Sequence, residues 1–148
     1  MVVIVCDDGR LLLHHRDDRP DIYYPGHWAG FGGALEAGEG DEDALLREMA
    51  EETGITLRRG EASVITCVPD PEARRDVTVY LLRRTIAFEE IDLQEGQGVG
   101  LFHVSELDDL QIPPFLHDVL DAHVVPLAAA LAARRSPPPD QRRSCSAM

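Results

Sequence analysis

Lysine is missing from this sequence, so all fourteen basic side chains are arginines, against 27 acidic residues. The net charge is −13, and the last fifteen residues carry +3, which leaves −16 on the preceding 133. A body of this charge repels a nucleic-acid backbone, which basic proteins bind by releasing counterions. The charge therefore argues against a nucleic-acid partner. A small polyanion could still bind if a divalent cation lay between it and the protein.

Cysteines and long apolar runs are also scarce. Cys6, Cys67 and Cys145 form an odd set without metal-ligand spacing, and a reduced cytoplasmic setting is the simplest interpretation. No uninterrupted apolar run approaches the roughly 18 residues that cross a bilayer. The apolar residues 1–5 are not preceded by a basic segment and are soon followed by Asp7 and Asp8, unlike the apolar core of a signal peptide. The sequence thus predicts a cytoplasmic protein without a membrane partner.

The length and composition fit one globular domain. The chain has 148 residues, of which 44% are hydrophobic and 28% charged, and these proportions are far from those of a disordered chain. Three consecutive prolines follow Ser136, and few apolar residues come after them. We therefore expect a folded domain over 1–135 and a disordered tail over 136–148 that contributes to neither fold nor activity.

Strand-like and helix-like segments are mixed without regular alternation, which predicts an α+β or layered α/β/α domain. Two apolar runs flank an Asp-Asp-Gly hairpin signal. Two later strands are expected around a Pro-Asp-Pro turn at 69–71, and the last helix is expected to be interrupted or restarted at Pro126. The predicted strands are 2–6, 10–15, 62–68, 76–86 and 98–104, and the predicted helices are 41–53 and 114–135.

A long loop precedes the first predicted helix. Residues 17–40 are rich in Asp, Pro and Gly, with six glycines between positions 26 and 40. Long loops inside compact domains are often functional. Asp41 is a good N-cap for the helix that follows, and Gly54 is a natural stop.

The predicted helix has two different faces. At about 100° per residue, its apolar arc is expected to hold Leu45, Leu46, Met49 and Ala50. Glu48, Glu51 and Glu52 are expected on the opposite arc, with Arg47 at the edge. Three converging carboxylates need a positive partner, and hard oxygen ligands suit Mg²⁺ or Mn²⁺ better than zinc. On its own, such a pattern is more often a solvated helix face.

The flanking residues favour the metal site. Residues 33–39 (GALEAGE) and 47–55 (REMAEETGI), separated by seven residues, resemble the Nudix box at every defining position. That pattern is Gly, five residues, Glu, seven residues, then Arg-Glu-aliphatic-any-Glu-Glu-any-Gly-aliphatic. The approach at 27–33 (HWAGFGG) is similar to that of the family too, although Phe31 stands where a proline is commoner.

The resemblance implies an α/β/α sandwich with a mixed sheet and Mg²⁺-dependent (or Mn²⁺-dependent) cleavage of a pyrophosphate bond. It implies metal ligands at Glu48, Glu51, Glu52 and the Gly32 carbonyl. Glu48 and Glu52 would also be catalytic, together with Arg47, which would orient the site by pairing with Glu48 or with Glu39. Structural roles are implied for Gly33, Gly38, Glu39 and Gly54. Many relatives add a carboxylate from a later loop. Glu95, before a Gly-Gln-Gly run that we expect to be flexible, is the candidate here.

Signals for the substrate are weaker. Arg16 could contact a phosphate, and Trp28 and Phe31 could stack on a base, although packing explains both aromatics equally well. The short chain favours a nucleoside triphosphate. ADP-ribose or another nucleotide sugar is the alternative, because Pro71 lies sixteen residues past Ile55, where ADP-ribose-cleaving relatives often have a proline. A non-catalytic nucleotide sensor and assembly as a homodimer both stay open.

Overall fold

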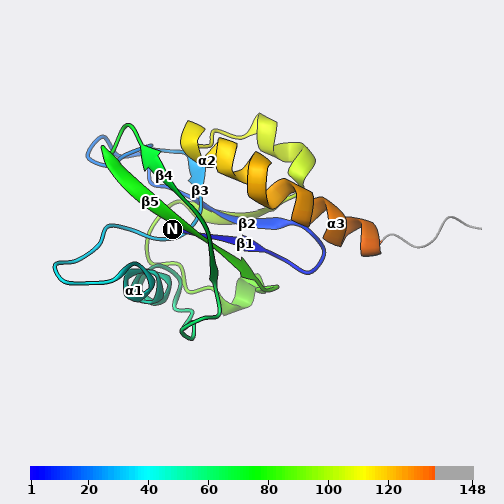
Figure 1. Ribbon diagram of the computed structural model, residues 1–148, viewed down its shortest axis with the longest axis horizontal. Coiled ribbons are helices and arrows are strands. Elements are labelled where there is room, and N and C mark those ends of the chain that lie inside the picture. The colour runs from blue at the N-terminus through cyan, green and yellow to red at the C-terminus, as the bar shows by residue number, and fades with distance from the viewer. Residues whose placement is uncertain (136–148) are drawn as a thin grey trace, which may run out of the picture.

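Short apolar strands near the amino terminus form the centre of the sheet in the computed structural model, which describes residues 1–135 (Figure 1). The predicted tail, 136–148, lies outside the described residues. The elements in chain order are β1 (Val2–Val5), β2 (Leu11–His15), β3 (Trp28–Ala29), α1 (Asp41–Thr53), β4 (Ser63–Asp70), β5 (Arg75–Arg83), the 3₁₀ turn η1 (Phe88–Glu90), β6 (Gly98–Phe102), the 3₁₀ turn η2 (Val104–Asp109), α2 (Pro114–Val119), the π-helical η3 (Leu120–Val124) and α3 (Val125–Arg135).

The sheet is mixed, as predicted. Its strands run in the order β3-β2-β1-β5-β4, and β6 pairs with β2 as well. β1 pairs with β5 in parallel, whereas the other neighbours are antiparallel. The hairpin between β1 and β2 closes at the predicted Asp-Asp-Gly turn, where the Gly9 N–H donates to the Cys6 carbonyl at 2.9 Å.

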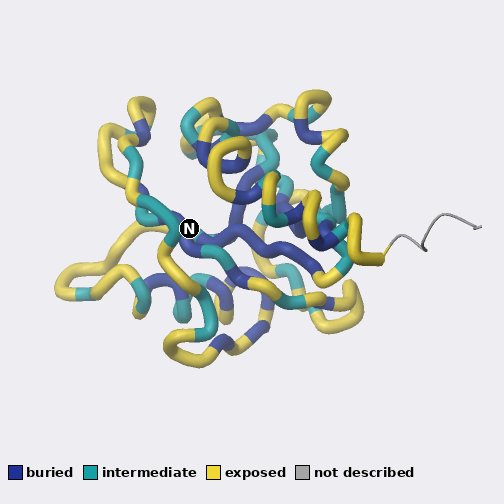
Figure 2. Tube along the Cα trace, turned by 45° about the vertical axis from the view of Figure 1, so that its right-hand side comes forward, coloured by how far each residue is buried: buried dark blue, intermediate teal, exposed yellow. Residues whose placement is uncertain are grey.

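Both faces of the sheet are covered, because the central strands are apolar on both sides. Val2 and Ile4 of β1 belong to one buried cluster together with Met49 of α1. Val3 and Val5 belong to the other, against α2, η3 and α3. Figures 1 and 2 show the buried strands between the helix α1 and the carboxy-terminal helices. This arrangement is the predicted α/β/α sandwich.

The hairpin between β4 and β5 differs from the prediction. A Pro-Asp-Pro turn was expected at 69–71, but β4 continues through Pro69 to Asp70, and the chain reverses over 71–74. Because β4 lies at the edge of the sheet, the missing N–H of Pro69 is tolerated there. Asp70 holds the turn, since its Oδ1 accepts the N–H groups of Glu72 and Ala73 at 3.1 and 3.2 Å.

The carboxy-terminal helix contains the expected irregularity at Pro126. Proline lacks an N–H and clashes with the carbonyl four residues earlier, so it cannot continue a regular helix. The five residues of η3, Leu120–Val124, adopt π-helical bonding, and the Val125 N–H donates to the Leu120 carbonyl. α3 then begins at Val125, with Pro126 in its first turn. The helix is thus interrupted and restarted without losing its direction.

This helical stretch also changes the membrane expectation. Pro114–Arg135 is 22 residues long and contains an 18-residue window with a mean hydropathy of 1.4, which satisfies the length and composition of a bilayer-crossing helix. The sequence prediction missed it because polar residues such as Asp118 and Asp121 interrupt the apolar run. The candidate is weak, because Leu116, Val124 and other side chains of its inner face pack against the sheet.

A short strand inside the long loop was not predicted. β3 pairs with β2 through His14 opposite Ala29 and His15 opposite Trp28. A strand of two residues is too short to show alternating polar and apolar side chains, and the surrounding glycines and prolines indicated a loop. Its effect is to place the glycines that follow it beside the start of β1, where the Val2 N–H donates to the Phe31 carbonyl at 2.8 Å.

Candidate active site

The helix α1 has the predicted length, but its N-cap is Gly40 and not Asp41. Asp41 is the first helical residue, and its Oδ2 accepts a 2.6 Å hydrogen bond from the Thr78 hydroxyl. The predicted stop is confirmed. Gly54 adopts the left-handed conformation with φ of 72° and donates to the Ala50 carbonyl.

The two faces of α1 are not divided as the sequence predicted. Met49 is buried as expected, whereas Ala50 is exposed. Glu52 was placed on the outer arc, but it is only 5% exposed, because it follows Met49 by three positions and the two share a face. The side chain of Glu48 is 14% exposed and that of Glu51 is 60% exposed. The three carboxylates therefore extend from the core to the solvent along one edge of the helix.

Glu52 is hydrogen-bonded to the glycine loop, which is the segment 30–40 between β3 and α1. The Gly32 N–H donates to Glu52 Oε2 at 3.0 Å. Burial raises the pKa of Glu52 to about 7, the nearby charges of Glu48 and Glu95 act in the same direction, and the Gly32 hydrogen bond and Arg16 oppose them. A cation at this position would lower the pKa of Glu52, since a positive charge stabilises the ionised carboxylate.

This pKa shift predicts a pH-dependent stability in metal-free protein. Because the pKa of folded Glu52 lies above its usual 4.5, the folded protein keeps a proton that the unfolded chain releases between pH 4.5 and about 7. Stability should therefore fall as pH rises through this window. We expect the Tm of Glu52→Gln minus that of the parent protein, measured by calorimetry with EDTA, to grow from acidic to alkaline pH. A difference that stays flat would contradict the buried charge.

Arg47 uses all five of its N–H donors within the motif. Its Nε and Nη2 donate to the two oxygens of Glu39, both at 2.9 Å. Its Nη1 donates to Glu48 at 2.7 Å and to Glu51 at 3.1 Å, and a further Nη2 bond reaches the Ala34 carbonyl at 3.1 Å. The sequence predicted a partner in Glu48 or Glu39, and Arg47 contacts both. The guanidinium holds the pKa of Glu39 near 2.

The chemistry of the donors fits a hard divalent cation. Glu48, Glu51 and Glu52 supply carboxylate oxygens on one helix edge, and Gly32, the fourth predicted ligand residue, lies on the loop beside Glu52. Within residues 1–135, no three acidic, histidine or cysteine side chains are already gathered around one ion position. Glu48 and Glu51 turn to Arg47 instead. Arg47 contacts Oε1 of Glu48 and Oε2 of Glu51, so the other oxygen of each carboxylate makes no contact with the guanidinium.

Gly33 leaves the space that the Glu48 carboxylate occupies. A β-carbon at this position would lie 2.4 Å from Glu48 Oε1 and 2.8 Å from Oε2. The backbone of Gly33 is not in the left-handed region, so an alanine would be tolerated there apart from this contact. The glycine is therefore required by the carboxylate and not by the fold.

We expect Gly33→Ala to lower turnover by about ten- to a hundredfold, because displacing a reacting group by about an ångström costs that much. The Tm should stay close to that of the parent protein. Gly38→Ala is the matched control. It strains a left-handed backbone with open space around it, so it should lower the Tm and spare the activity. Equal loss of activity in both variants would exclude this role of Gly33.

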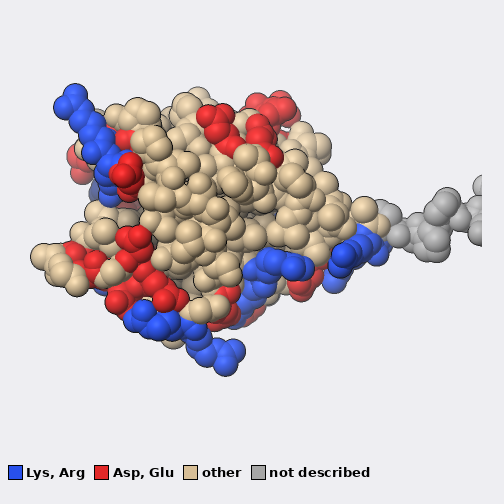
Figure 3. All heavy atoms as spheres, viewed as in Figure 1, with Lys and Arg blue, Asp and Glu red and all other residues tan. Residues whose placement is uncertain are grey.

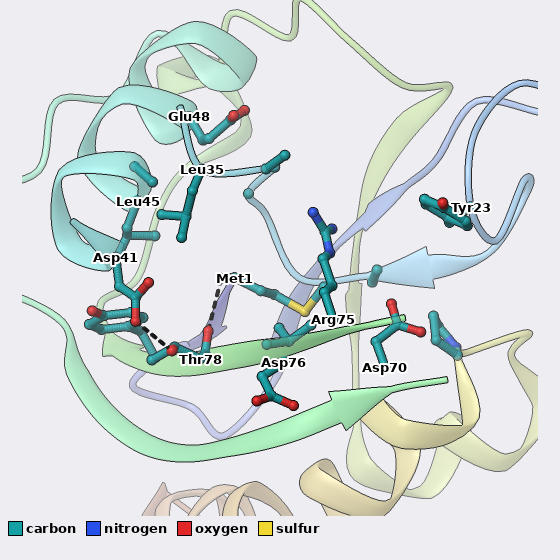
Figure 4. A pocket seen from close by; sticks show the side chains of 18 of the residues that line it. Met1, Tyr23, Leu35, Asp41, Leu45, Glu48, Asp70, Arg75, Asp76 and Thr78 are labelled. Atoms are coloured by element: carbon teal, nitrogen blue, oxygen red, sulfur yellow. Dashed lines mark hydrogen bonds between the residues drawn. The ribbon is translucent and has the colours of Figure 1, made fainter. Parts of the chain in front are cut away.

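A cavity of about 360 Å³ lies beside the carboxylates (Figure 4). Figure 4 shows Glu48 at one rim and the Arg75 side chain rising into the cavity from the start of β5. Arg16 also lines it, as expected for a phosphate contact, and its Nε donates to the Tyr23 carbonyl. Among the described residues, no carboxylate lies within 4.0 Å of either guanidinium. Sequence reasoning missed Arg75, although strand alternation places it on the same face as Val77.

The two aromatic candidates pack within the protein. Phe31 is completely buried, and its ring stacks on His14 with centroids 5.3 Å apart. It therefore has no free face for a base, which corrects the expectation. Trp28 stacks on His15 at 4.4 Å and meets the edge of Phe102 at 4.8 Å. Trp28 does not line the cavity, so the structure assigns it the packing role.

The loop that carries Glu95 is held firmly against β2. The buried His14 donates from Nε2 to the Glu95 carbonyl at 2.9 Å, and the Gln97 N–H donates to the His15 carbonyl at 2.8 Å. A β-carbon on Gly96 would lie 1.9 Å from His14 Nε2. The expected flexible run is therefore wrong, because the glycine serves a close approach. The exposed Glu95 carboxylate is close enough to Glu52 to raise its pKa.

Whether Glu95 completes the site stays a prediction. We expect Glu95→Gln to lower turnover and to shift the pH profile, because a carboxylate near the acidic edge would take part in metal binding or proton transfer. Glu89→Gln is the control in this region. The neighbouring Glu90 is unsuitable, because it accepts a hydrogen bond from the Ala87 N–H and holds the 3₁₀ turn η1. An unchanged rate and pH profile in Glu95→Gln would remove Glu95 from the mechanism.

Comparison with known proteins identifies the same motif. A family model for the NUDIX domain matches residues 1–141. The nucleoside triphosphatase NudI of Escherichia fergusonii is 48% identical over 59 residues, which cover 36% of this chain and 40% of that protein. NudI of Escherichia coli strain SE11 is 46% identical over the same length. The similarity thus spans less than half of these curated relatives.

Solved structures show the same fold. A MutT structure described for Aliivibrio salmonicida and Vibrio cholerae has a TM-score of 0.56 and 25% identity, covering 90% of this chain and 94% of that chain. An Ap4A hydrolase of C. elegans has a TM-score of 0.63 and 21% identity, covering 89% and 96%. The second likeness shows the fold alone.

The family match agrees with the motif, the mixed sheet and the two helical layers. It extends through the strands and helices on both sides of the acidic helix, so it does not depend on the box alone. The sequence prediction is confirmed at this level. The chain belongs to the Nudix hydrolase family.

Proposed function

We propose that this protein is a Mg²⁺-dependent pyrophosphohydrolase that cleaves a phosphoric anhydride bond in a nucleoside triphosphate. One observation carries the proposal. Glu48 of the acidic edge lines a cavity that is also lined by Arg16 and Arg75, and neither arginine pairs with a carboxylate among the described residues. In a protein with net charge −13, two such arginines beside carboxylates indicate a site for an anion together with a cation.

The metal would be held by Glu48, Glu51 and Glu52, with the Gly32 carbonyl beside them. Bound Mg²⁺ or Mn²⁺ supplies charge neutralisation and acidifies a bound water. The protein's own part is positioning. Arg47 fixes the acidic edge to the glycine loop, and the Gly32 N–H orients Glu52. We propose that Arg47 keeps its ion pair with Glu48 when the cation binds and so holds that carboxylate in place.

Arg16 and Arg75 would bind the phosphates from the opposite side. Arg16 follows β2 and Arg75 begins β5, so two strands of one rigid sheet set the distance between them. Guanidinium groups match phosphate oxygens in charge and in hydrogen-bond geometry. A triphosphate held between these arginines and the acidic edge would have its anhydride bonds lying across the cavity.

Similarity to NudI, a nucleoside triphosphatase by name, favours a triphosphate as the substrate. The alternatives are ADP-ribose or another nucleotide sugar, and a nucleotide sensor without activity. All the carboxylates of the box are retained, which favours an enzyme over a sensor. A small-molecule nucleotide as partner, a cytoplasmic location and a homodimer stay predictions.

A panel assay tests the proposal. Nucleoside triphosphates, ADP-ribose and other nucleotide sugars are incubated with the protein and Mg²⁺, and the products are separated by chromatography. We expect a nucleoside monophosphate from at least one triphosphate, abolished by EDTA and restored by Mg²⁺. Faster release of the monophosphate from ADP-ribose would make nucleotide sugars the substrate class instead of triphosphates. Nucleotide binding without turnover, with either Mg²⁺ or Mn²⁺, would establish a sensor instead.

A further inference from the structure

Two segments that are far apart in the sequence each supply one arginine to the cavity. Arg16 precedes the loop 17–27, and Arg75 begins β5 after the turn 71–74. The same cavity is also lined by four carboxylates, those of Asp41, Glu48, Asp70 and Asp76. Figure 3 shows acidic side chains gathered over α1 as well. Because these charges repel an anion, a phosphate binds best where the two guanidinium groups are presented together, so their separation should control its affinity.

One tyrosine connects the two segments. The Tyr24 hydroxyl donates to Asp70 Oδ1 at 2.6 Å, and the Tyr24 N–H donates to Glu72 Oε1 at 3.2 Å. Burial and the bond to Asp70 raise the pKa of Tyr24 to about 12, so the hydroxyl keeps its proton at neutral pH. Within residues 1–135, no other residue of the loop 17–27 forms a hydrogen bond with the β4–β5 hairpin. We call the bond between the two side chains the Tyr24–Asp70 link.

On the loop side, the link lies next to the contact that holds Arg16. The Arg16 Nε donates to the Tyr23 carbonyl at 3.0 Å. This carbonyl and the Tyr24 N–H belong to one planar peptide group, so the bond from that N–H to Glu72 also orients the acceptor of Arg16. The backbone of Tyr24 is in the left-handed region with φ of 51°, which is rare for an aromatic residue. Such strain persists only where surrounding contacts hold it, and these contacts are the ones that the link provides.

On the hairpin side, Asp70 connects the link to Arg75. Asp70 is 4% exposed and lies opposite Arg75 in the ladder between β4 and β5, and Figure 4 shows both in the cavity. The Oδ1 atom that accepts the Tyr24 hydroxyl also accepts the N–H groups of Glu72 and Ala73, in the turn before Arg75. One oxygen atom therefore joins the loop to the turn from which Arg75 emerges.

We infer that the Tyr24–Asp70 link is a positioning device for the phosphate site. It sets the separation of the guanidinium groups of Arg16 and Arg75, and it acts through them without contacting the substrate. The inference rests on the proposed function, since it takes these arginines as the groups that bind the phosphates. Without the link both arginines remain, but they are presented together for a smaller fraction of the time. The apparent affinity for phosphates falls with that fraction.

Tyr24→Phe tests the link, because it removes the hydroxyl and keeps the ring that packs near Phe115. Binding of imidodiphosphate, a slowly hydrolysed pyrophosphate analogue, is measured with Mg²⁺ by titration calorimetry on the full-length protein. We expect the Kd to rise about tenfold, since loss of a hydrogen bond to a charged group shifts a local equilibrium by about that factor. In the triphosphate assay, the KM should rise similarly with little change in kcat, because binding is weakened and the chemical step is not.

Thr85→Val is the matched control. It removes another hydroxyl that donates to a distant aspartate, Asp7 at 3.0 Å, outside the cavity. It should leave both the Kd and the KM unchanged. A merely structural effect of Tyr24→Phe would reduce the fraction of folded protein, which lowers the binding stoichiometry and kcat and leaves the Kd and KM as in the parent protein. That pattern, or an unchanged Kd in Tyr24→Phe, would overturn the inference.

A double-mutant cycle shows whether the link acts through an arginine. In an Arg75→Gln background, Tyr24→Phe should raise the Kd by a clearly smaller factor than in the parent protein, because one of the two groups that the link positions is already gone. The same factor in both backgrounds would mean that Tyr24 acts independently of Arg75, and the positioning role would then be excluded.

Hydrogen exchange on the unaltered chain checks the coupling without any substitution. Coupling is reciprocal, so if the link favours phosphate binding, phosphate binding must stabilise the link by the same factor. We expect imidodiphosphate with Mg²⁺ to slow exchange of the amides of Tyr24, Glu72 and Ala73, the three N–H groups bonded within this network. Unchanged exchange at all three would contradict the inference, even if Tyr24→Phe failed to fold.

Failure of the two proposals can be told apart. If the parent protein binds imidodiphosphate and cleaves triphosphates, but Tyr24→Phe binds the analogue as tightly, only the positioning role is wrong. If the parent protein does not bind the analogue at all, the phosphate site and the proposed function are wrong, and the positioning role falls with them.

Discussion

Replacing Glu52 or Glu48 with glutamine will lower turnover at least about a hundredfold at saturating Mg²⁺, and the protein will keep its fold. Partners that only orient metal ligands already contribute ten- to a hundredfold, so loss of a ligand should cost no less. Glutamine has almost the same volume as glutamate, and its amide oxygen can still accept the Gly32 N–H at position 52. The loss would therefore come from charge and not from packing.

The control for this prediction lies on the same helix. Glu42→Gln changes a carboxylate of the first turn that pairs with Arg59 and not with the motif, and it should leave turnover unchanged. Rates are measured across a range of Mg²⁺ concentrations, and folding is checked by circular dichroism. Near-normal turnover by either Glu48→Gln or Glu52→Gln would refute the metal site.

Arg47→Lys will lower turnover by about ten- to a hundredfold and will also lower the Tm. A lysine keeps the positive charge, but its ammonium cannot reach Glu39, Glu48 and the Ala34 carbonyl at once, as the five donors of the guanidinium do. The hydrogen bonds that join the glycine loop to the acidic helix through Arg47 would be weakened, and Glu48 would lose its orientation. The change in rate follows from that lost positioning.

Arg59→Lys provides the comparison. Arg59 also bridges two carboxylates of α1, Glu42 and Asp43, but its side chain is 62% exposed. Exposed pairs contribute little, so a lysine there should be nearly neutral in both rate and Tm. If Arg47→Lys behaved like Arg59→Lys, Arg47 would be a surface residue and the positioning role would be untenable.

The sequence predicted the acidic helix well, because its limits depend on local chemistry. The acidic first turn and Gly54 act within a few residues of themselves, and the helix runs from Asp41 to Thr53 as expected. The assignment of faces was less accurate. Glu52 was placed on the outer arc of the helix, although its spacing of three positions from Met49 puts the two on one face, and it is buried there. Its hydrogen bond from the Gly32 N–H comes from a distant loop and cannot be read from periodicity.

The rest of the site depends on which segments the fold brings together. Arg75 faces Glu48 across the cavity only because β5 lies beside β1, and no local pattern encodes that neighbour. Phe31 was a candidate for base stacking because aromatic faces bind bases well, but its pairing with Val2 places it in the core. The motif residues and Arg16 were thus predictable, whereas Arg75 on the cavity wall was not.

The position of β1 has a consequence for how the chain acquires this structure. β1 lies between β2 and β5, and Val2 pairs with Tyr80, 78 residues away. Pairings so distant in sequence slow folding, because a large loop must close before they form. During synthesis, β1 leaves the ribosome early and stays without its β5 partner until residues 80–83 have emerged. A strand that is apolar on both faces is then open to wrong partners, so a pause before β5 is the interval in which this protein is most prone to aggregate.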